Sequence, residues 1–156
     1  VKEICKRHGA LFLVNDNVDI AKAMDADGVH VGQDDMAALD ARAKLGPDKL
    51  IGVSAHTVEE ALLAEKQGAD YLGVGAVFPT SSKDDVDVLP YETLKAICGA
   101  VSIPVVAIGG ISQENVAKLA GSGICGVAVI SAIYAAKNIK SAAEELKAAA
   151  EAMLRA

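Results

Sequence analysis

The sequence has no tryptophan, and aromatic residues make up only 3% of its 156 residues. A chain poor in aromatic residues but rich in Ala, Val, Ile and Gly is typical of buried parallel strands crossed by Ala-rich helices, and it argues against an aromatic-rich β-sandwich. Cysteine is also scarce: Cys5, Cys98 and Cys125 have no metal-ligand spacing. We therefore expect an α/β protein with reduced thiols, located in the cytoplasm.

An excess of positive charge is missing as well. The chain has 15 Lys and Arg against 21 Asp and Glu, which gives a net charge of -6. This balance argues against a nucleic-acid surface or an anionic-membrane patch, because both need concentrated Lys and Arg. No apolar run reaches the roughly 18 residues of a membrane span. We expect small-molecule partners, and a phosphorylated ligand would need local charge or a metal.

The length and the content of hydrophobic residues, 52%, predict one globular domain over residues 1–156. Residues 1–8 have the pattern of the last turns of a helix, so we expect that sequence upstream of them is missing. The hydrophobic pattern predicts six buried strands, at 11–14, 28–32, 50–54, 71–77, 104–110 and 126–131.

Helical patterns follow each of these strands. Thr57 and Glu60 form a capping box at the start of one helix, and Gly68 ends it. We expect Ser112 to cap the helix that runs to about Ala120, and Ser141 to cap the closing helix. The same helix-to-strand junction occurs three times, at 26–32, 69–75 and 124–130. Repeated strand–helix units predict a parallel sheet, and in a (β/α) barrel the strand ends form the active face.

The loop after the strand at 71–77 carries three hydroxyls and an ammonium in a row, Thr80, Ser81, Ser82 and Lys83. Such a loop suits an anion, because short donors can point at phosphate oxygens while lysine supplies the charge. An ordinary polar loop is the alternative, and for these residues alone it is the more common case.

Polar residues end the other strands too. Asp16 and Asp35 follow adjacent strands, so both carboxylates could face one Mg²⁺. For either residue alone, a helix N-cap is the simpler interpretation. Gly109-Gly110 and the segment that starts at Ser131 can offer backbone N–H groups to a phosphate.

Two histidines lie near these strand ends. His30 lies inside a strand, where a hydrogen-bonded core histidine is more common than a base. His56 follows a strand, and we expect a loop or capping role for it.

Six runs of the sequence match one family in order: 15–16, 28–35, 51–57, 73–83, 103–111 and 126–131. On these runs the chain resembles thiamine phosphate synthases. The resemblance implies a TIM (β/α)8 barrel, here incomplete with about six units and without the first two. It also implies a transferase that joins hydroxymethylpyrimidine diphosphate to thiazole phosphate, giving thiamine phosphate and pyrophosphate.

The resemblance also implies the roles of single residues. Asp16 and Asp35 match the Mg²⁺ ligands, while Asn15, Ser54 and Lys83 match contacts to the pyrimidine diphosphate, the last two being the catalytic candidates. The remaining matches concern the thiazole phosphate: Thr80, Ser81 and Ser82 in one loop, and Gly110, Ile130 and Ser131 on a second contact. No covalent protein nucleophile is required.

The sequence departs from the family pattern in two respects. Ser82 stands where the family often has threonine, and the family's Gln, Arg and Lys cluster for the diphosphate has no counterpart. We therefore expect the 156-residue form alone to bind thiazole phosphate, to couple the substrates hardly at all, and to self-associate or be marginally stable through its open sheet edges. Two other interpretations stay open: a thiazole tautomerase, which would not need Asp16 and Asp35, and a non-catalytic barrel fragment that binds a phosphorylated ligand.

Overall fold

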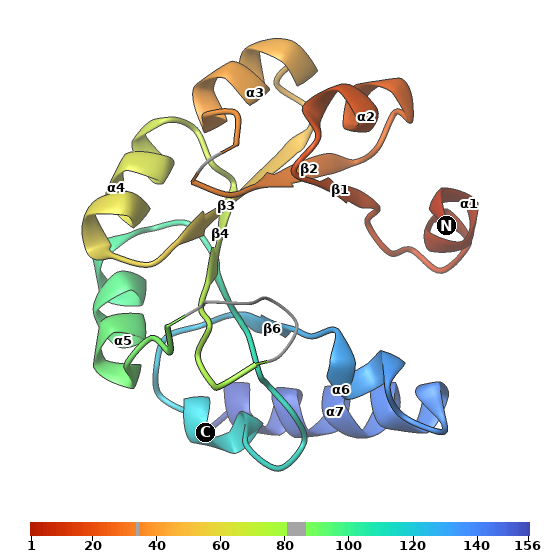
Figure 1. Ribbon diagram of the computed structural model, residues 1–156, viewed down its shortest axis with the longest axis vertical. Helices are drawn as coiled ribbons and strands as arrows, with labels where there is room; N and C mark the ends of the chain where they lie inside the picture. Colours follow the sequence, from red (N-terminus) through yellow and green to blue (C-terminus); the bar gives the residue numbers. More distant parts are fainter. Residues whose placement is uncertain (34, 81–86) are drawn as a thin grey trace.

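The computed structural model describes residues 1–33, 35–80 and 87–156. Its centre is a parallel sheet whose six strands lie side by side in the order of the sequence. The strands are β1 (Leu13–Asn15), β2 (Gly28–Val31), β3 (Leu50–Ala55), β4 (Tyr71–Val74), β5 (Val105–Ile108) and β6 (Gly126–Ala128). Figure 1 shows that the sheet curls, with the helices outside it and β1 and β6 at its two ends. The predicted α/β class and the parallel sheet of strand–helix units are thus confirmed.

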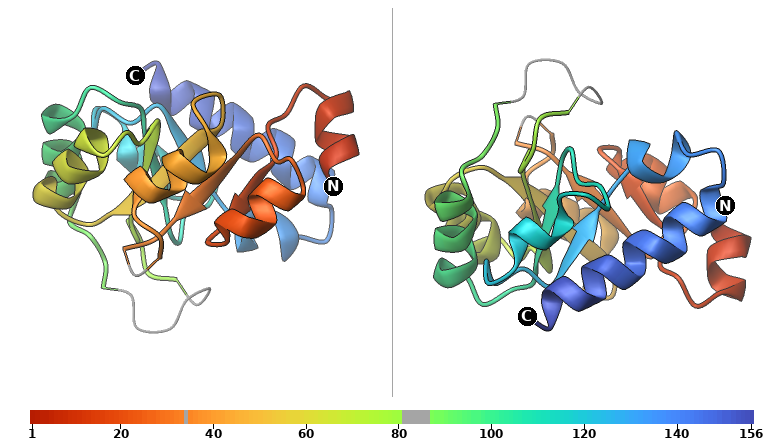
Figure 2. Two further views of the ribbon diagram at one scale, coloured as in Figure 1. Left: turned by 90° about the horizontal axis from the view of Figure 1, so that it is seen from above. Right: turned by 90° about the horizontal axis from the view of Figure 1, so that it is seen from below.

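The helices follow the strands as the sequence predicts. They are α1 (Lys2–Arg7), α2 (Val18–Ala23), α3 (Ala38–Leu45), α4 (Val58–Lys66), α5 (Tyr91–Ala100), the 3₁₀ turn η1 (Val116–Leu119), α6 (Ser131–Tyr134) and α7 (Ile139–Leu154). The long α7 packs against η1 and β6, on the outside of the sheet (Figure 2). None of the helices in the described ranges combines the length and apolar character needed to cross a lipid bilayer.

The strands have two different faces because successive side chains point to opposite sides. Val29, Ile51 and Leu72 face the helices and are fully buried. The alternate positions face the hollow of the curled sheet, among them His30, which is in register with Gly52 on β3. The convex face therefore forms the core, and the concave face remains available for a ligand.

The threefold sequence repeat corresponds to a contact between neighbouring strands. A carboxylate at the start of one strand accepts a hydrogen bond from the backbone of the strand before it. Asp27 accepts from the Phe12 amide at 2.8 Å, and Asp70 accepts from the Ile51 amide at 2.7 Å. The third copy has Cys125 instead, whose own amide donates to the Val105 carbonyl at 2.9 Å. The repeated Asp thus sets strand register at the amino edge of the sheet.

Asp70 also pairs with Arg42, whose guanidinium lies 2.6 Å away and donates to the Lys49 and Gly68 carbonyls. We expect Asp70→Ala to lower the free energy of unfolding by about 2 kcal/mol, because the Ile51 amide loses its acceptor and the half-buried guanidinium loses its carboxylate. Urea unfolding followed by circular dichroism measures this. Asp19→Ala, which removes a carboxylate from an exposed pair with Lys44, should change the stability by less than about 0.5 kcal/mol. Equal losses in the two variants would contradict the role of Asp70.

Two of the predicted helix caps are wrong. Ser112 caps no helix: its hydroxyl donates to Glu114, and the expected helix is only the 3₁₀ turn η1. The closing helix begins earlier than predicted, because Asn138 caps it by accepting from the Ser141 amide at 3.1 Å. The Thr57 cap is confirmed, with its hydroxyl accepting from the Glu60 amide at 3.1 Å.

Candidate active site at the carboxyl edge of the sheet

The polar residues that follow the strands lie along one edge, because all six strands are parallel and neighbours in sequence are neighbours in the sheet. Asn15 is in register with His30, and Ser54 with Gly73. The candidate residues at this edge are Asn15, Asp16, Asp35, Ser54, Thr80, Gly110, Ile130 and Ser131. Ser81, Ser82 and Lys83 lie outside the described residues.

The two candidate carboxylates follow β1 and β2, which pair with each other. Asp16 is exposed, its backbone has a left-handed φ of 64°, and its amide donates to the His30 carbonyl at 2.7 Å. Asp35 is also exposed, and its Oδ2 accepts from the Gly32 amide at 2.7 Å. Both carboxylates therefore lie close to the ends of neighbouring strands.

Neither carboxylate caps a helix, so the simpler interpretation of these residues is wrong. Asn17 caps α2, where its Oδ1 accepts from the Ile20 amide at 2.9 Å. Helix α3 begins after Ala37 without a side-chain cap. In residues 1–33, 35–80 and 87–156, no group of three or more His, Cys, Asp and Glu side chains could hold a metal ion. A metal held by Asp16 and Asp35 would therefore need further oxygen ligands from a substrate or water.

A hydrogen-bonded group that the sequence did not reveal lies on the concave face. The ring of His30 lies between the Tyr71 hydroxyl, 3.0 Å from its Nδ1, and the Ser54 hydroxyl, 3.1 Å from its Nε2. Gln33 donates from its side chain to the Ser54 carbonyl at 2.5 Å. Burial raises the pKa of the Tyr71 phenol, which keeps it protonated. His30 is thus hydrogen-bonded, as the sequence predicts, but it is half-buried on the concave face rather than in the core.

Two glycines make room for these rings. A Cβ at Gly52 would come within 2.1 Å of the Tyr71 ring and 2.4 Å of Nδ1 of His30. A Cβ at Gly73 would lie 2.9 Å from Cε1 of His30. Since both contacts are shorter than real Cβ contacts, a side chain at either position would displace the histidine. The glycines of β3 and β4 are the sequence signal for this group, but they can be interpreted only when the strand register is known.

The start of the hydroxyl loop lies against the glycine pair that follows β5. The Val77 amide donates to the Ile108 carbonyl at 3.0 Å, and the Phe78 amide donates to the Gly109 carbonyl at 3.1 Å. A Cβ at Gly110, whose φ is 64°, would lie 2.3 Å from the Pro79 carbonyl oxygen. Glycine is therefore required at this turn, and the half-buried Thr80 begins the loop beside it.

Asn115 holds the glycine turn in place, a role that the sequence did not reveal. Its side-chain amide donates to the Gly110 carbonyl at 2.9 Å and its Oδ1 accepts from the Ser112 amide at 2.8 Å. The segment after β6 is less enclosed: Ile130 is 59% exposed, and Ser131 begins the single helical turn α6.

His56 takes the loop role that the sequence predicts, just before the Thr57 cap of α4. Its amide donates to Oε2 of Glu60 at 2.7 Å, and its ring lies 3.2 Å from the same oxygen. These contacts fasten the loop between β3 and α4, so His56 supports the edge next to Ser54.

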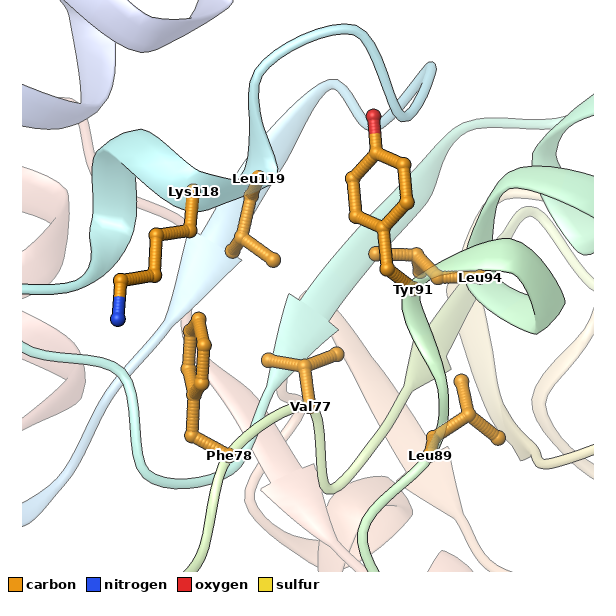
Figure 3. Close-up of a pocket in the computed structure, with 7 residues that line it drawn as sticks. All are labelled: Val77, Phe78, Leu89, Tyr91, Leu94, Lys118 and Leu119. Carbon is orange, nitrogen blue, oxygen red and sulfur yellow. The ribbon is translucent and has the colours of Figure 1, made fainter.

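An apolar pocket of about 230 Å³ lies between η1 and the segments that lead from β4 into α5 (Figure 3). Lys118 is the one charged residue among the seven that line it, beside Val77, Phe78, Leu89, Tyr91, Leu94 and Leu119. This lining does not suit a diphosphate. Val77 and Phe78, which precede Thr80 in the chain, form part of the pocket wall.

Comparison with known proteins gives a consistent result. The family model for thiamine monophosphate synthase matches residues 1–133. The chain is 54% identical to the thiamine-phosphate synthase of Methanobrevibacter smithii over 146 residues, which is 94% of this chain and 70% of that protein. It is 49% identical to the enzyme of the same name from Pyrococcus abyssi, covering 99% of this chain and 74% of that one.

A solved structure agrees with these relatives. The thiamine phosphate pyrophosphorylase of Pyrococcus furiosus superposes with a TM-score of 0.90 at 46% identity, over 98% of this chain and 73% of that chain. The similarity therefore extends over nearly all of this sequence and about three quarters of the solved protein.

Proposed function

Because this chain belongs to the thiamine monophosphate synthase family, we propose that it joins hydroxymethylpyrimidine diphosphate to thiazole phosphate, forming thiamine phosphate and pyrophosphate. It is a transferase of thiamine biosynthesis. The observation that carries the proposal is the identity of 54% to a thiamine-phosphate synthase, which extends over the candidate edge. No described feature favours a thiazole tautomerase or a non-catalytic fragment.

The reaction transfers the pyrimidine methylene carbon from the diphosphate oxygen to the thiazole nitrogen. The bond between the pyrimidine methylene carbon and the diphosphate oxygen breaks, and its electron pair leaves with pyrophosphate. The thiazole nitrogen then supplies the electron pair of the new carbon–nitrogen bond. The protein needs to hold the nitrogen against the forming cation and to stabilise the departing charge, so no covalent nucleophile takes part.

Asp16 and Asp35 fit a Mg²⁺ site. Their carboxylates follow paired strands and are exposed, and Oδ1 of Asp35 is not the oxygen used by the Gly32 amide. Mg²⁺ accepts one or two carboxylates with phosphate oxygens and water as its other ligands, so two carboxylates and a diphosphate would together supply a sufficient ligand set. Bound there, the ion supplies positive charge to the leaving group.

Asn15, Ser54 and Lys83 are proposed to contact the pyrimidine diphosphate. The concave-face position of Ser54, which hydrogen bonds to His30, supports a contact to the ring rather than to the phosphates. Lys83 supplies a cation for the departing pyrophosphate, a role assigned by the family resemblance.

Thiazole phosphate is proposed to bind farther along the edge from Asp16 and Asp35, at the hydroxyl loop after β4 and the glycine turn after β5. The backbone contacts between Phe78 and Gly109 support this pairing of Thr80, Ser81 and Ser82 with Gly110. Ile130 and Ser131 complete the proposed phosphate site from the end of β6. Two anionic subsites then lie at different places on one edge.

The curled sheet supports a partial barrel. Six consecutive parallel strands with helices on the convex side are what six neighbouring units of a (β/α)8 barrel would form. We propose that residues 1–156 form one domain that supplies six of the eight units, the first two lying outside this sequence. The exposed Leu11 and Ile130, at the two ends of the sheet, would then be covered by those units or by a second copy. The free thiols of Cys5, Cys98 and Cys125 suit the cytoplasmic location that we propose for the enzyme.

A variant of the glycine turn tests the thiazole phosphate site. We expect Asn115→Ala to weaken the binding of thiazole phosphate about tenfold, because the Gly110 turn loses both hydrogen bonds that hold it. Fluorescence or calorimetric titration measures the dissociation constant. Asn138→Ala removes a cap of similar geometry from α7 and should lower the stability without changing the affinity. If Asn115→Ala bound thiazole phosphate as tightly as the wild type, the turn would not be part of the site.

The activity itself is tested with the full-length protein, both substrates and Mg²⁺. We expect thiamine phosphate and pyrophosphate in equal amounts, and no product when a chelator removes the metal. Isomerisation of the thiazole without release of pyrophosphate would instead support the tautomerase.

A further inference from the structure

The Tyr71, His30 and Ser54 side chains form a chain of hydrogen bonds across three neighbouring strands. Tyr71 lies on β4, His30 on β2 and Ser54 on β3. The links measure 3.0 Å and 3.1 Å, and the glycines at 52 and 73 leave the space for the rings. The direction of these hydrogen bonds decides what Ser54 can offer to a ligand.

The direction follows from the phenol. Among the described residues, His30 is the hydrogen-bond partner of the Tyr71 hydroxyl, and Tyr71 is half-buried. Burial raises the pKa of the Tyr71 phenol, so the phenol keeps its proton and can donate it to Nδ1 of His30. In that arrangement the ring proton lies on Nε2, which donates to the Ser54 oxygen, and both contacts of the ring are satisfied.

Protonation of the ring does not alter this result. In an imidazolium both nitrogens donate, so Ser54 again accepts from Nε2. In either state the proton of the Ser54 hydroxyl is directed away from His30. Because Ser54 is half-buried on the concave face, this proton is available to a ligand on that face.

We propose that Tyr71 and His30 are positioning residues that hold the Ser54 hydroxyl as a hydrogen-bond donor, and that this donor selects an aromatic heterocycle with an unprotonated ring nitrogen. The inference rests on the proposed function, since the pyrimidine of the diphosphate substrate is such a ring. A hydroxyl whose oxygen is already occupied by Nε2–H discriminates against a ring that presents C–H or N–H at the same point, because neither accepts its proton.

The ligand side of the test uses pyrimidine diphosphates in which each ring nitrogen in turn is replaced by C–H. In the full-length wild-type protein, one of these analogues should bind about tenfold more weakly than the natural substrate, the effect of one hydrogen bond. In Ser54→Ala this discrimination should fall to about twofold or less, because the donor is gone.

The protein side uses variants that keep one ring contact each. In His30→Gln the side-chain amide lies at about the position of Nε2 and can still donate to Ser54. This variant should keep at least half of the difference in binding between substrate and analogue, on a logarithmic scale. In His30→Asn the shorter amide reaches only toward Tyr71, so this difference should be lost and the KM for the pyrimidine diphosphate should rise. Tyr71→Phe should reduce the discrimination, since the tautomer is no longer imposed. The KM for thiazole phosphate should stay within about twofold in all three.

Tyr91→Phe is the matched control. It removes a phenol hydrogen bond of 2.7 Å to the Ala120 carbonyl in the helix layer, away from the concave face. It should change the thermal midpoint about as much as Tyr71→Phe, without changing the discrimination. Equal discrimination in wild type, His30→Asn and Tyr71→Phe would overturn the proposal, as would no discrimination in the wild type. A wild-type protein that forms no thiamine phosphate would instead count against the proposed function.

Discussion

Asp35→Ala should lower kcat by about 100- to 1,000-fold and leave the dissociation constant of thiazole phosphate within about threefold. The carboxylate follows β2, which pairs with the strand that precedes Asp16, and it is proposed to act through Mg²⁺ on the diphosphate. Thiazole phosphate is proposed to bind at the far part of the edge, at Gly110, and so does not need this charge. Steady-state kinetics and a separate titration of thiazole phosphate measure the two quantities.

Two control variants separate the effect of the Asp35 charge on turnover from the effect of Asp35 on the loop structure. Asp35→Asn keeps an oxygen that can accept from the Gly32 amide but lacks the charge, so it should be nearly as slow as alanine. Asp40→Ala removes an exposed carboxylate from the first turn of α3 and should keep the wild-type rate. If Asp35→Asn had full activity, the residue would act through the loop rather than through a metal. Equal losses in turnover and thiazole phosphate affinity would also contradict the assignment.

Gly110→Ala should weaken thiazole phosphate binding by at least about 100-fold and lower the free energy of unfolding by about 2–4 kcal/mol. Its φ is 64°, and a Cβ would approach the Pro79 and Phe78 carbonyl oxygens to 2.3 and 2.6 Å. The turn would have to separate from the segment that leads into the hydroxyl loop. Titration of the ligand and chemical unfolding measure the two effects.

Alanine substitutions at two other glycines separate the effect of backbone strain from the effect of the steric clash of an added Cβ. Gly9 has almost the same φ, 65°, but no atom within 4 Å of its added Cβ, so Gly9→Ala should show only the backbone strain, about 1–2 kcal/mol. Gly99 lies in α5 with open space around it, so Gly99→Ala should stabilise the protein by roughly 0.5–1 kcal/mol. Neither should alter binding. A Gly110→Ala protein that binds thiazole phosphate normally would show that the turn is not part of the site.

The sequence was sufficient to predict the arrangement of the sheet, because apolar runs and strand–helix repeats are local signals and parallel order follows from them. It did less well at element ends. The Gly-rich run that begins at Tyr71 predicts a strand to Val77, but β4 ends at Val74, since the next residues pair along the glycine turn instead. Ser112 and Ser141 resemble caps, yet η1 begins after Asn115 with no side-chain cap, and Asn138 caps the closing helix. Competing side chains of similar chemistry within one turn cannot be ranked from sequence spacing.

In the candidate site, too, the sequence predicts the placement of residues along the sheet but not their individual contacts. Parallel topology predicts that Asp16, Asp35 and Ser54 share an edge, and the structure brings them there. The contacts of His30 with Tyr71 and Ser54 join residues 41 and 24 positions apart in the chain, so no local pattern reveals them. Their trace in the sequence is the pair of glycines at 52 and 73, whose purpose depends on strand register.

One sheet edge is proposed to hold two separate anionic subsites. The subsite for the pyrimidine diphosphate depends on a metal, and the subsite for thiazole phosphate is built from hydroxyls and a glycine turn. Calorimetric titration of the full-length protein with each substrate, in Mg²⁺ and again in a chelator, tests it most directly. We expect the affinity for the pyrimidine diphosphate to fall at least about tenfold without Mg²⁺, and the affinity for thiazole phosphate to change by less than about twofold. An equal dependence of both substrates on Mg²⁺, or no dependence for either, would contradict the claim.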